Sequence, residues 1–316
     1  MGGGVLVSVC LPVRNGAEYI GEALGSVLAQ DVDGLEVVVS DNCSTDDTAE
    51  IIRAFGDRRV VYTRSEALVS QVDNFNRALG LAQGEFVCVF HHDDAMMPGN
   101  LRRKLEVLRG EPKLGFVHSN VLQINSGGSC IGEHWDAGSR KDYVWDGLRF
   151  VKYAICRVNP VSASSVVMRG QCVRRVGQFR RNAGVACDLD MWFRMALSCP
   201  VGCLGQALVK HRWAEASVTR GVGVVRVLTD DLRVRRWASE LLLAAEPSGM
   251  EVWQRAMDQF SERAVLMAHR ALRNGNPWLA WKLVVLAGRT SPAAVAGVWG
   301  RVVRRRLGGF ASTWRM

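Results

Sequence analysis

Two adjacent carboxylates, Asp93 and Asp94, follow an apolar run at residues 86–90 that predicts a buried strand. Neighbouring carboxylates repel each other, and both prefer water to an apolar strand end, so a shared cation would stabilise the pair. A divalent ion that carries a diphosphate needs hard oxygen ligands of this kind at the carboxyl end of a strand. A solvated turn is the alternative, because Asp favours turns and Pro98 follows closely.

A third acid, Asp41, stands at the end of another predicted strand, at residues 35–39. The carboxyl ends of parallel strands meet at one edge of a sheet, which places Asp41 on the same side as Asp93. A buried carboxylate there accepts hydrogen bonds from a nucleobase N–H or a ribose hydroxyl. A helix-capping loop is the alternative, for which Ser44 and Asp46 suffice.

Alternating strands and helices are predicted to position these acids. Strands are predicted at residues 5–11, 35–39, 60–63 and 86–90, and helices at residues 17–29, 45–55, 72–82 and 98–108. The second helix has a capping-box-like start, Ser44 with Asp47 three residues on. This alternation predicts an α/β protein with right-handed crossovers and a mainly parallel, Rossmann-like sheet flanked by helices.

The pattern changes further along the chain. A β-rich stretch is expected at residues 115–131, a helix at 145–155, a short strand at 165–168 and a helix at 189–198. Beyond Arg220 only helices are expected, at residues 230–245, 251–273, 278–288 and 293–307.

The glycines at residues 2–4 do not form a phosphate-binding loop. They precede the first strand, whereas dinucleotide and P-loop fingerprints follow a strand and open a helix. Residues 12–16 after the first strand read P-V-R-N-G and match neither fingerprint. This argues against a Rossmann dehydrogenase, a P-loop NTPase and the glycine-rich entry loop of sugar nucleotidyltransferases.

Five segments between residues 5 and 219 resemble, in the right order, the family-2 inverting glycosyltransferases. They are P-V-R-N with S-V-L-A-Q at residues 12–30, S-D-N-C-S-T-D at 40–46, N-F-N-R-A-L with A-Q-G-E at 74–85, H-H-D-D at 91–94 and D-L-D-M-W-F-R at 188–194. The H-H-D-D segment sits where the family carries its D-x-D metal motif. The last segment resembles the family's E-D-x-D-L-W-x-R motif.

The resemblance implies a GT-A fold, a UDP-, GDP- or dTDP-linked sugar donor and a Mg²⁺ or Mn²⁺ ion. It implies Asp93 as the first metal ligand, with Asp94 in support. The ion would bridge the diphosphate oxygens and neutralise charge on the leaving nucleotide. The positions that correspond to the donor pocket of the family are Pro12, Asn15, Glu18, Asp41, Asn74 and Asp93.

Asp188 aligns with the family's catalytic base, which takes the proton from the acceptor hydroxyl during attack on the anomeric carbon. A carboxylate suits this role when partial desolvation raises its pKa towards the working pH. An N-cap is the alternative reading, because Asp188 immediately precedes the helix predicted from Leu189. We expect Asp190 to be structural and Trp192 to belong to the core rather than to a sugar platform.

Three positions depart from the family pattern. His91 replaces the first acid of D-x-D, and Cys187 replaces the Glu before the base. Ala214 stands where the family often has a histidine that is sometimes a metal ligand, so either the metal has fewer ligands here or His211 substitutes. These changes keep open a catalytically silent protein that binds nucleotide sugars. A glycoside hydrolase with two carboxylates would leave the acids at residues 41, 93 and 94 unexplained.

The resemblance implies an acceptor hydroxyl on a growing glycan, lipid-linked or otherwise, as in polysaccharide biosynthesis. The segment Asn159–Ser165 faces the acceptor in the family. Its polar side chains would contact sugar hydroxyls or would satisfy the backbone of the loop.

The charge is unevenly distributed. The net charge is +9, yet residues 1–219 carry 24 basic and 24 acidic side chains, whereas residues 220–316 carry 16 and 7. We therefore predict a glycosyltransferase domain at residues 1–219, with a nucleotide-sugar half at about 1–120 and an acceptor half at about 121–219. A basic helical region is predicted at residues 220–316.

We expect a cytoplasmic protein. The nine cysteines are scattered without metal-ligand spacing, and neither a signal peptide nor a membrane-spanning stretch is predicted. Residues 298–307 combine Trp, Val and Arg at near-helical spacing, which suggests a helix lying on an anionic membrane at the inner face or, alternatively, a packed helix with a solvated basic face. Nucleic-acid binding is not expected, since no reader motif accompanies the charge.

Overall fold

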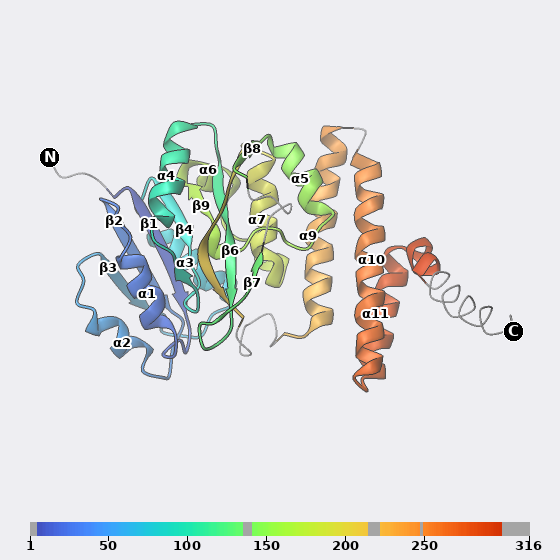
Figure 1. Ribbon diagram of the computed structural model, residues 1–316, viewed down its shortest axis with the longest axis horizontal. Coiled ribbons are helices and arrows are strands. Elements are labelled where there is room, and N and C mark those ends of the chain that lie inside the picture. The colour runs from blue at the N-terminus through green and yellow to red at the C-terminus, as the bar shows by residue number, and fades with distance from the viewer. Residues whose placement is uncertain (1–4, 135–140, 214–221, 247–248, 299–316) are drawn as a thin grey trace, which may run out of the picture. The chain divides into compact units, whose positions relative to one another are not determined.

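The computed structural model describes residues 5–134, 141–213, 222–246 and 249–298 (Figure 1). The chain divides into two compact units, one of residues 1–151 and 159–221 and one of residues 152–158 and 222–316. The boundary first falls within helix α5 (Gly147–Ile155), whose final residues belong to the second unit.

A sheet of ten strands runs through the described part of the first unit, with helices on either side (Figure 1). The strand order is β3-β2-β1-β4-β9-β6-β10-β5, with β7 paired to β6 and β8 to β10. The N-terminal strands are β1 (Val7–Val13), β2 (Leu35–Asp41), β3 (Val60–Arg64) and β4 (Phe86–Val89), and they pair in parallel. Helices α1 (Ile20–Leu28), α2 (Thr48–Ala54) and α3 (Gln71–Leu81) connect them.

The C-terminal half of this unit makes the sheet mixed. Its strands are β5 (Ala95–Met96), β6 (Phe116–Ile124), β7 (Cys130–His134), β8 (Tyr143–Trp145), β9 (Val167–Arg169) and β10 (Val201–Arg212). Its other helices are α4 (Asn100–Gly110), α6 (Gly170–Val176), α7 (Cys187–Ala196) and the 3₁₀ turns η2 (Ala163–Ser165) and η3 (Arg181–Ala186). β6 and β10 are parallel, whereas β9 runs antiparallel between β4 and β6.

The predicted alternation of strands and helices in the first hundred residues is confirmed. Strands β1, β2 and β4 are buried along their length because valine and other apolar side chains face helices on both sides, whereas β3 at the edge of the sheet is only partly buried. The strand register pairs Val13 with Asp41 and Cys10 with Val89, so β1, β2 and β4 end at the same edge of the sheet.

Two local predictions are wrong. The predicted helix at residues 145–155 begins later, because Trp145 pairs with Val201 in the sheet and its indole stacks on Tyr143 with ring centroids 4.1 Å apart. Ser44 does not open a capping box, because its hydroxyl accepts a hydrogen bond from the backbone N–H of Asn15 and the helix starts only at Thr48.

The described part of the second unit contains the long helices α9 (Val224–Ala245), α10 (Gly249–Arg273) and α11 (Pro277–Thr290), which confirms three of the predicted helices. α10 and α11 lie side by side (Figure 1), with small side chains such as Ala264, Ala268 and Ala287 buried between them. None of the described helices is long and apolar enough to cross a membrane. The helix predicted at residues 293–307 lies largely outside the described residues.

One lysine of the first unit is buried in an apolar setting. Lys104 of α4 is fully buried, and its Nζ donates a hydrogen bond of 2.9 Å to Oδ1 of Asn100. Desolvation by burial lowers the pKa of Lys104 to about 7, and no carboxylate among the described residues compensates its charge. The neutral amine is therefore the form that the fold favours.

This burial makes the stability of the fold depend on pH. An unfolded lysine keeps its proton up to about pH 10.4, so above pH 7 the unfolded state binds more protons and stability rises with pH. We expect the free energy of unfolding to rise between pH 7 and pH 9 by up to about 1.4 kcal/mol per pH unit more in the parent than in Lys104→Gln. Urea titrations at several pH values measure this difference.

The variant Lys113→Gln, which removes an exposed lysine, should follow the parent. Parallel profiles for the parent and Lys104→Gln would contradict the buried neutral lysine.

Candidate active site

The loops that follow β1, β2 and β4 meet at one edge of the sheet. A Cβ atom at Gly16 would lie 2.6 Å from the His92 ring, so only glycine lets the loop after β1 approach the loop after β4. His92 also interacts electrostatically with Asp46 in the loop after β2. The segments that carry Asn15, Asp41 and Asp93 are thus neighbours.

His91, Asp93 and Asp94 form a cluster that suits a divalent cation. One ligand atom from each lies within 4.8 Å of the other two. Within the described residues, the Asp93 carboxylate makes no hydrogen bond or ion pair, and Nε2 of His91 is buried without a partner. Ligand atoms of this kind, held close together and in part without protein partners, fit an ion such as Mg²⁺ or Mn²⁺.

Asp94 differs from Asp93 because its carboxylate is buried and already has partners. One oxygen accepts a 2.8 Å hydrogen bond from the backbone N–H of Arg212, and Nδ1 of His211 lies 3.2 and 3.3 Å from the two oxygens. Burial alone would raise the pKa of Asp94, but His211, His91 and Ser164 outweigh burial and lower it. Asp94 therefore stays ionised.

His211 takes part in this arrangement. Burial alone would lower its pKa, but the hydrogen bond to Asp94 and the charge of Asp94 raise it. The pair therefore favours a protonated imidazole beside an ionised carboxylate. The structure thus places His211 at the acidic loop, while Ala214 lies outside the described residues.

Arg212, which sequence reasoning missed, connects the acidic loop to the rest of the unit. The guanidinium is buried, and its Nε donates to the carbonyl of Asp93 at 2.8 Å. It also donates to the carbonyls of Asn125 and Ser126 and to the carboxylate of Glu22. Arg212 ends strand β10, which was not predicted from the sequence, and a lone arginine carries no signal of such a role.

The Asp188 carboxylate lies close enough to His91, a member of the same cluster, for the two groups to interact electrostatically. Its half-buried carboxylate accepts hydrogen bonds from the backbone N–H of Leu189 at 2.7 Å and from Nδ2 of Asn159 at 2.9 Å. Burial raises the pKa of Asp188 to about 6, and these hydrogen bonds and the nearby His91 offset only part of that effect. A carboxyl with this pKa can accept a proton near neutral pH.

The N-cap alternative for Asp188 is wrong. Helix α7 begins at Cys187 and its N-cap is Ala186, so Asp188 lies in the first turn. Asp190 is structural, because it forms a buried ion pair with Arg194 at 2.8 Å. Trp192 is part of the core, only 1% exposed and 5.4 Å from the ring of Phe116.

The segment at residues 159–165 holds the acids in place. Asn159 donates to Asp188, and the hydroxyl of Ser164 accepts a 3.1 Å hydrogen bond from the backbone N–H of His91 and bonds to Asp94. From the sequence we expected the polar side chains of this segment to contact acceptor hydroxyls or to satisfy the backbone of their own loop. Its role in supporting carboxylates of other segments depends on contacts distant in sequence.

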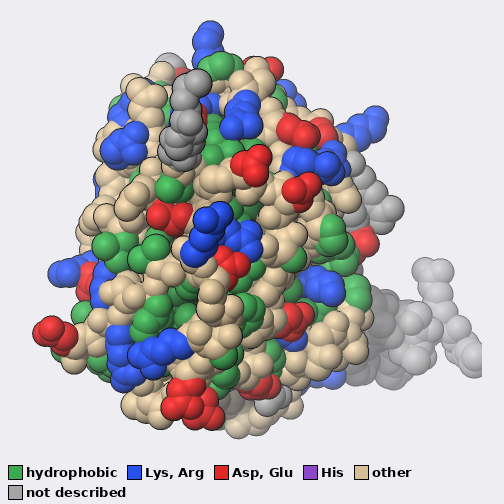
Figure 2. Space-filling model, turned by 90° about the vertical axis from the view of Figure 1, so that its left-hand side faces the viewer, with side chains coloured by type: hydrophobic (Ala, Val, Ile, Leu, Met, Phe, Trp, Pro, Cys, Tyr) green, Lys and Arg blue, Asp and Glu red, His purple; other side chains and the backbone are tan. Residues whose placement is uncertain are grey.

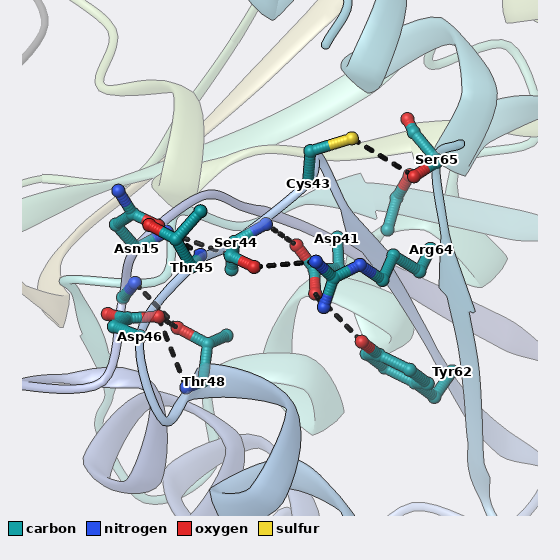
Figure 3. Close-up of polar contacts among 12 residues, drawn as sticks. Asn15, Asp41, Cys43, Ser44, Thr45, Asp46, Thr48, Tyr62, Arg64 and Ser65 are labelled. Atoms are coloured by element: carbon teal, nitrogen blue, oxygen red, sulfur yellow. Dashed lines mark hydrogen bonds and ion pairs between the residues drawn. The ribbon is translucent and has the colours of Figure 1, made fainter. Parts of the chain in front are cut away.

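A polar network joins the loops after β1 and β2 (Figure 3). The backbone N–H of Thr45 donates to Oδ1 of Asn15 at 2.8 Å. Asp46 accepts from the backbone N–H of Ala17, and Thr48 accepts from that of Gly16. These bonds hold the two loops against each other at the edge of the sheet.

Asp41 is at the centre of the second part of this network (Figure 3). The carboxylate is fully buried and accepts from the backbone N–H of Ser44 at 2.8 Å and from the hydroxyl of Tyr62 at 2.7 Å. Arg64 lies 3.9 Å away. Both carboxylate oxygens of Asp41 already accept hydrogen bonds from protein groups. Direct contact of Asp41 with a nucleoside stays a prediction.

The other residues predicted for the donor pocket are placed as follows. Asn15 and Glu18 are exposed at the exit of β1, Pro12 is buried within β1 opposite Ser40, and Asn74 is buried with both polar atoms on Ser40. Asn74 therefore links α3 to β2. A side chain that is fully hydrogen-bonded to its neighbours would shape a pocket rather than contact a ligand.

Two residues of these loops adopt left-handed backbone conformations without being glycine. Asn15 has φ 49° and Cys43 has φ 57°. Such conformations cost about 1–3 kcal/mol for ordinary side chains and persist where surrounding bonds enforce them. The thiol of Cys43, donating to the carbonyl of Ser65 at 3.1 Å, is one such bond.

Removal of the Arg212 side chain should destabilise the first unit. Arg212→Met leaves the carbonyls of Asp93, Asn125 and Ser126 without their donor, so we expect a loss of roughly 2–4 kcal/mol in the free energy of unfolding. Chemical denaturation measures the loss. Arg14→Met, which removes an exposed arginine, is the matched control, and an equal loss in both variants would refute the role of Arg212.

Comparison with known sequences identifies a family. The sequence profile described as Glycosyl transferase family 2 matches residues 8–152. An uncharacterized protein of Mycobacterium tuberculosis is 26% identical over 258 residues, 73% of this chain and 75% of the relative. An uncharacterized glycosyltransferase of Rickettsia prowazekii is 31% identical over 216 residues, 68% of this chain and 66% of the relative. Of two other relatives the chain spans only 20% and 34%.

Comparison with solved structures identifies the fold. Residues 1–349 of S. aureus TarS, crystallised in complex with UDP-GlcNAc, superpose with a TM-score of 0.61 at 17% identity, covering 88% of this chain and 90% of that one. The likeness confirms the predicted GT-A fold, here with a mixed sheet and C-terminal helices. Sequence and fold agree, and the chain belongs to glycosyltransferase family 2.

Proposed function

We propose that the chain transfers a sugar from a nucleotide-diphosphate donor to a hydroxyl of a glycan acceptor, with inversion at the anomeric carbon and with Asp188 as the base. The observation that carries the proposal is the environment of Asp188. Its carboxyl has a pKa of about 6, is oriented by Asn159, and lies within electrostatic range of His91 in the candidate cation cluster.

The proposed reaction is a single displacement. The acceptor oxygen forms a bond to the anomeric carbon as its proton passes to Asp188. The bond between the anomeric carbon and the diphosphate oxygen breaks, and the nucleoside diphosphate leaves with the electron pair. Attack opposite the leaving group inverts the configuration. Asp188 suits the proton transfer because it is ionised above about pH 6 yet only weakly acidic.

The loops around Asp93 would hold the donor. Asp93 and His91 have donor atoms left unsatisfied by the described residues, and with Asp94 they would hold Mg²⁺ or Mn²⁺. Such an ion supplies positive charge that stabilises the leaving diphosphate. The UDP-GlcNAc complex of TarS supports a nucleotide-sugar donor. Asn15 and Glu18 are exposed for contact, whereas Asp41 and Asn74 would shape the nucleoside pocket.

A second candidate is a catalytically silent protein that binds nucleotide sugars. It is favoured by His91 and Cys187, which stand where the family has acids. The hypothesis of a silent binding protein is correct if the parent binds a nucleoside diphosphate with Mn²⁺ but neither transfers nor hydrolyses the sugar of any UDP-, GDP- or dTDP-linked donor tested.

Replacement of the base should abolish transfer without unfolding the protein. We expect Asp188→Asn to lower kcat by roughly 10²–10⁴-fold, the usual contribution of a general base. In the parent, log kcat/KM should fall with a slope of one as the pH drops through about 6, because protonated Asp188 cannot accept a proton. Initial rates of nucleotide release with a competent donor and acceptor measure both effects.

The stability of Asp188→Asn separates loss of chemistry from loss of fold. Because the pKa of Asp188 is raised in the folded state, stability is lost as the pH rises through about 6, so the uncharged variant should melt no lower than the parent at pH 8. Asp33→Asn removes an exposed acid and serves as the control. Full activity of Asp188→Asn would exclude Asp188 as the base.

Removal of Asp93 should weaken metal-dependent donor binding. For Asp93→Asn we expect at least a tenfold higher Kd for a nucleoside diphosphate in the presence of Mn²⁺, and little change in the presence of EDTA, because the neutral amide is a poor ligand for the ion. Isothermal titration with UDP, GDP and dTDP measures this. If all three nucleotides bind both proteins equally with Mn²⁺, the cation cluster is wrongly assigned.

A further inference from the structure

The turn between α10 and α11 presents large apolar side chains to solvent. Leu272, Trp278 and Trp281 are 53%, 62% and 56% exposed. The two indoles stack with ring centroids 4.9 Å apart and an interplanar angle of 10°. Large apolar side chains that lie together at a surface mark a site of interaction.

The residues that end α10 and begin α11 fix the geometry of this turn. Gly275 has φ +72°, and the backbone N–H of Asn276 donates to the carbonyl of Ala271 at 2.9 Å, which ends α10. The side chain of Asn276 then caps α11 by accepting from Leu279, and Pro277 occupies the first turn. The exposed side chains are thus held on ordered helix ends.

The segment of the sequence that forms this turn is strongly basic. From Arg263 to the end of the sequence there are ten Lys and Arg and no Asp or Glu. Arg270, Arg273 and Lys282 are exposed, and Nζ of Lys282 lies 5.0 Å from the centre of the Trp278 ring. The face in Figure 2, in contrast, carries acidic and basic side chains intermingled.

We propose that this hairpin tip (Leu272, Trp278 and Trp281 with Arg270, Arg273 and Lys282) docks on an anionic lipid surface. Indole rings favour the interface between hydrocarbon and water, and leucine gains by burial there. Arginine and lysine beside them attract anionic headgroups. The surface lies apart in sequence from the basic segment at 298–307, most of which is outside the described residues.

The positive charge of the hairpin tip argues against a second copy of the tip, or residues 299–316, as the partner that covers it. A second copy of the tip would bring like charges together, which is unfavourable. Residues 299–316 carry five arginines and no acid, so they too would be repelled by the tip. An anionic partner is required, and the stacked apolar rings favour a bilayer interface over a nucleic acid.

Vesicle binding of the full chain tests the proposal without any sugar donor, so its failure would leave the transfer reaction untouched. We expect the protein to sediment with vesicles of phosphatidylcholine and phosphatidylglycerol and much less with phosphatidylcholine alone. Trp278→Ala/Trp281→Ala should lower the partition coefficient at least tenfold. Arg273→Gln/Lys282→Gln should lower it roughly tenfold at low salt and less at high salt.

Matched control variants test whether vesicle binding depends on the hairpin tip or on exposed apolar and basic side chains in general. Leu241→Ala/Met250→Ala removes exposed apolar side chains elsewhere in the same unit, and Arg58→Gln/Lys113→Gln removes exposed basic ones from the first unit. Both should bind vesicles like the parent. Melting curves confirm that the variants are folded.

Three outcomes would overturn the proposal. One is equal vesicle binding by the parent and Trp278→Ala/Trp281→Ala. Another is no vesicle binding by the parent, while light scattering shows an oligomer that the tryptophan variant loses, which would make the tip a self-association surface. The third is binding to a single-stranded oligonucleotide in place of anionic vesicles.

Discussion

Carboxylates gathered at one half-buried edge of a sheet repel each other, and the candidate site depends on how each is compensated. Asp94 is ionised because His211 and a backbone N–H satisfy it. Asp188 lacks a direct cationic partner among the described residues, so burial raises its pKa to about 6. Asp93 is unsatisfied by the described residues. Similar acids thus acquire different properties from their surroundings.

Much of the first unit maintains this arrangement. Arg212 connects the acidic loop to the β6–β7 turn and to α1 through charge-assisted hydrogen bonds of its buried guanidinium. The loops after β1 and β2 are held in costly conformations at Asn15 and Cys43 by bonds between the loops and to Ser65, the residue after β3. Strain and buried charge are tolerated here because a large apolar sheet supports them.

The two units differ in composition as well as in structure. The first is an α/β unit with nearly equal numbers of acidic and basic side chains, and it holds the candidate catalytic groups. The second is helical in its described part and accounts for the positive net charge of the chain. A basic helical surface with exposed tryptophans suits attachment, whereas the buried acids of the first unit suit group transfer.

The sequence by itself determined the α/β alternation, the strand ends that carry Asp41 and Asp93, and the family, because hydrophobic periodicity and motif spacing are local properties. It did not reveal the antiparallel insertion of β9, the β-structure of Trp145, or the roles of Asn159, Ser164 and Arg212. These depend on contacts between segments distant in the chain. The tertiary structure alone decided which acid is ionised and which is buried, because desolvation and hydrogen bonding arise only once those segments pack together.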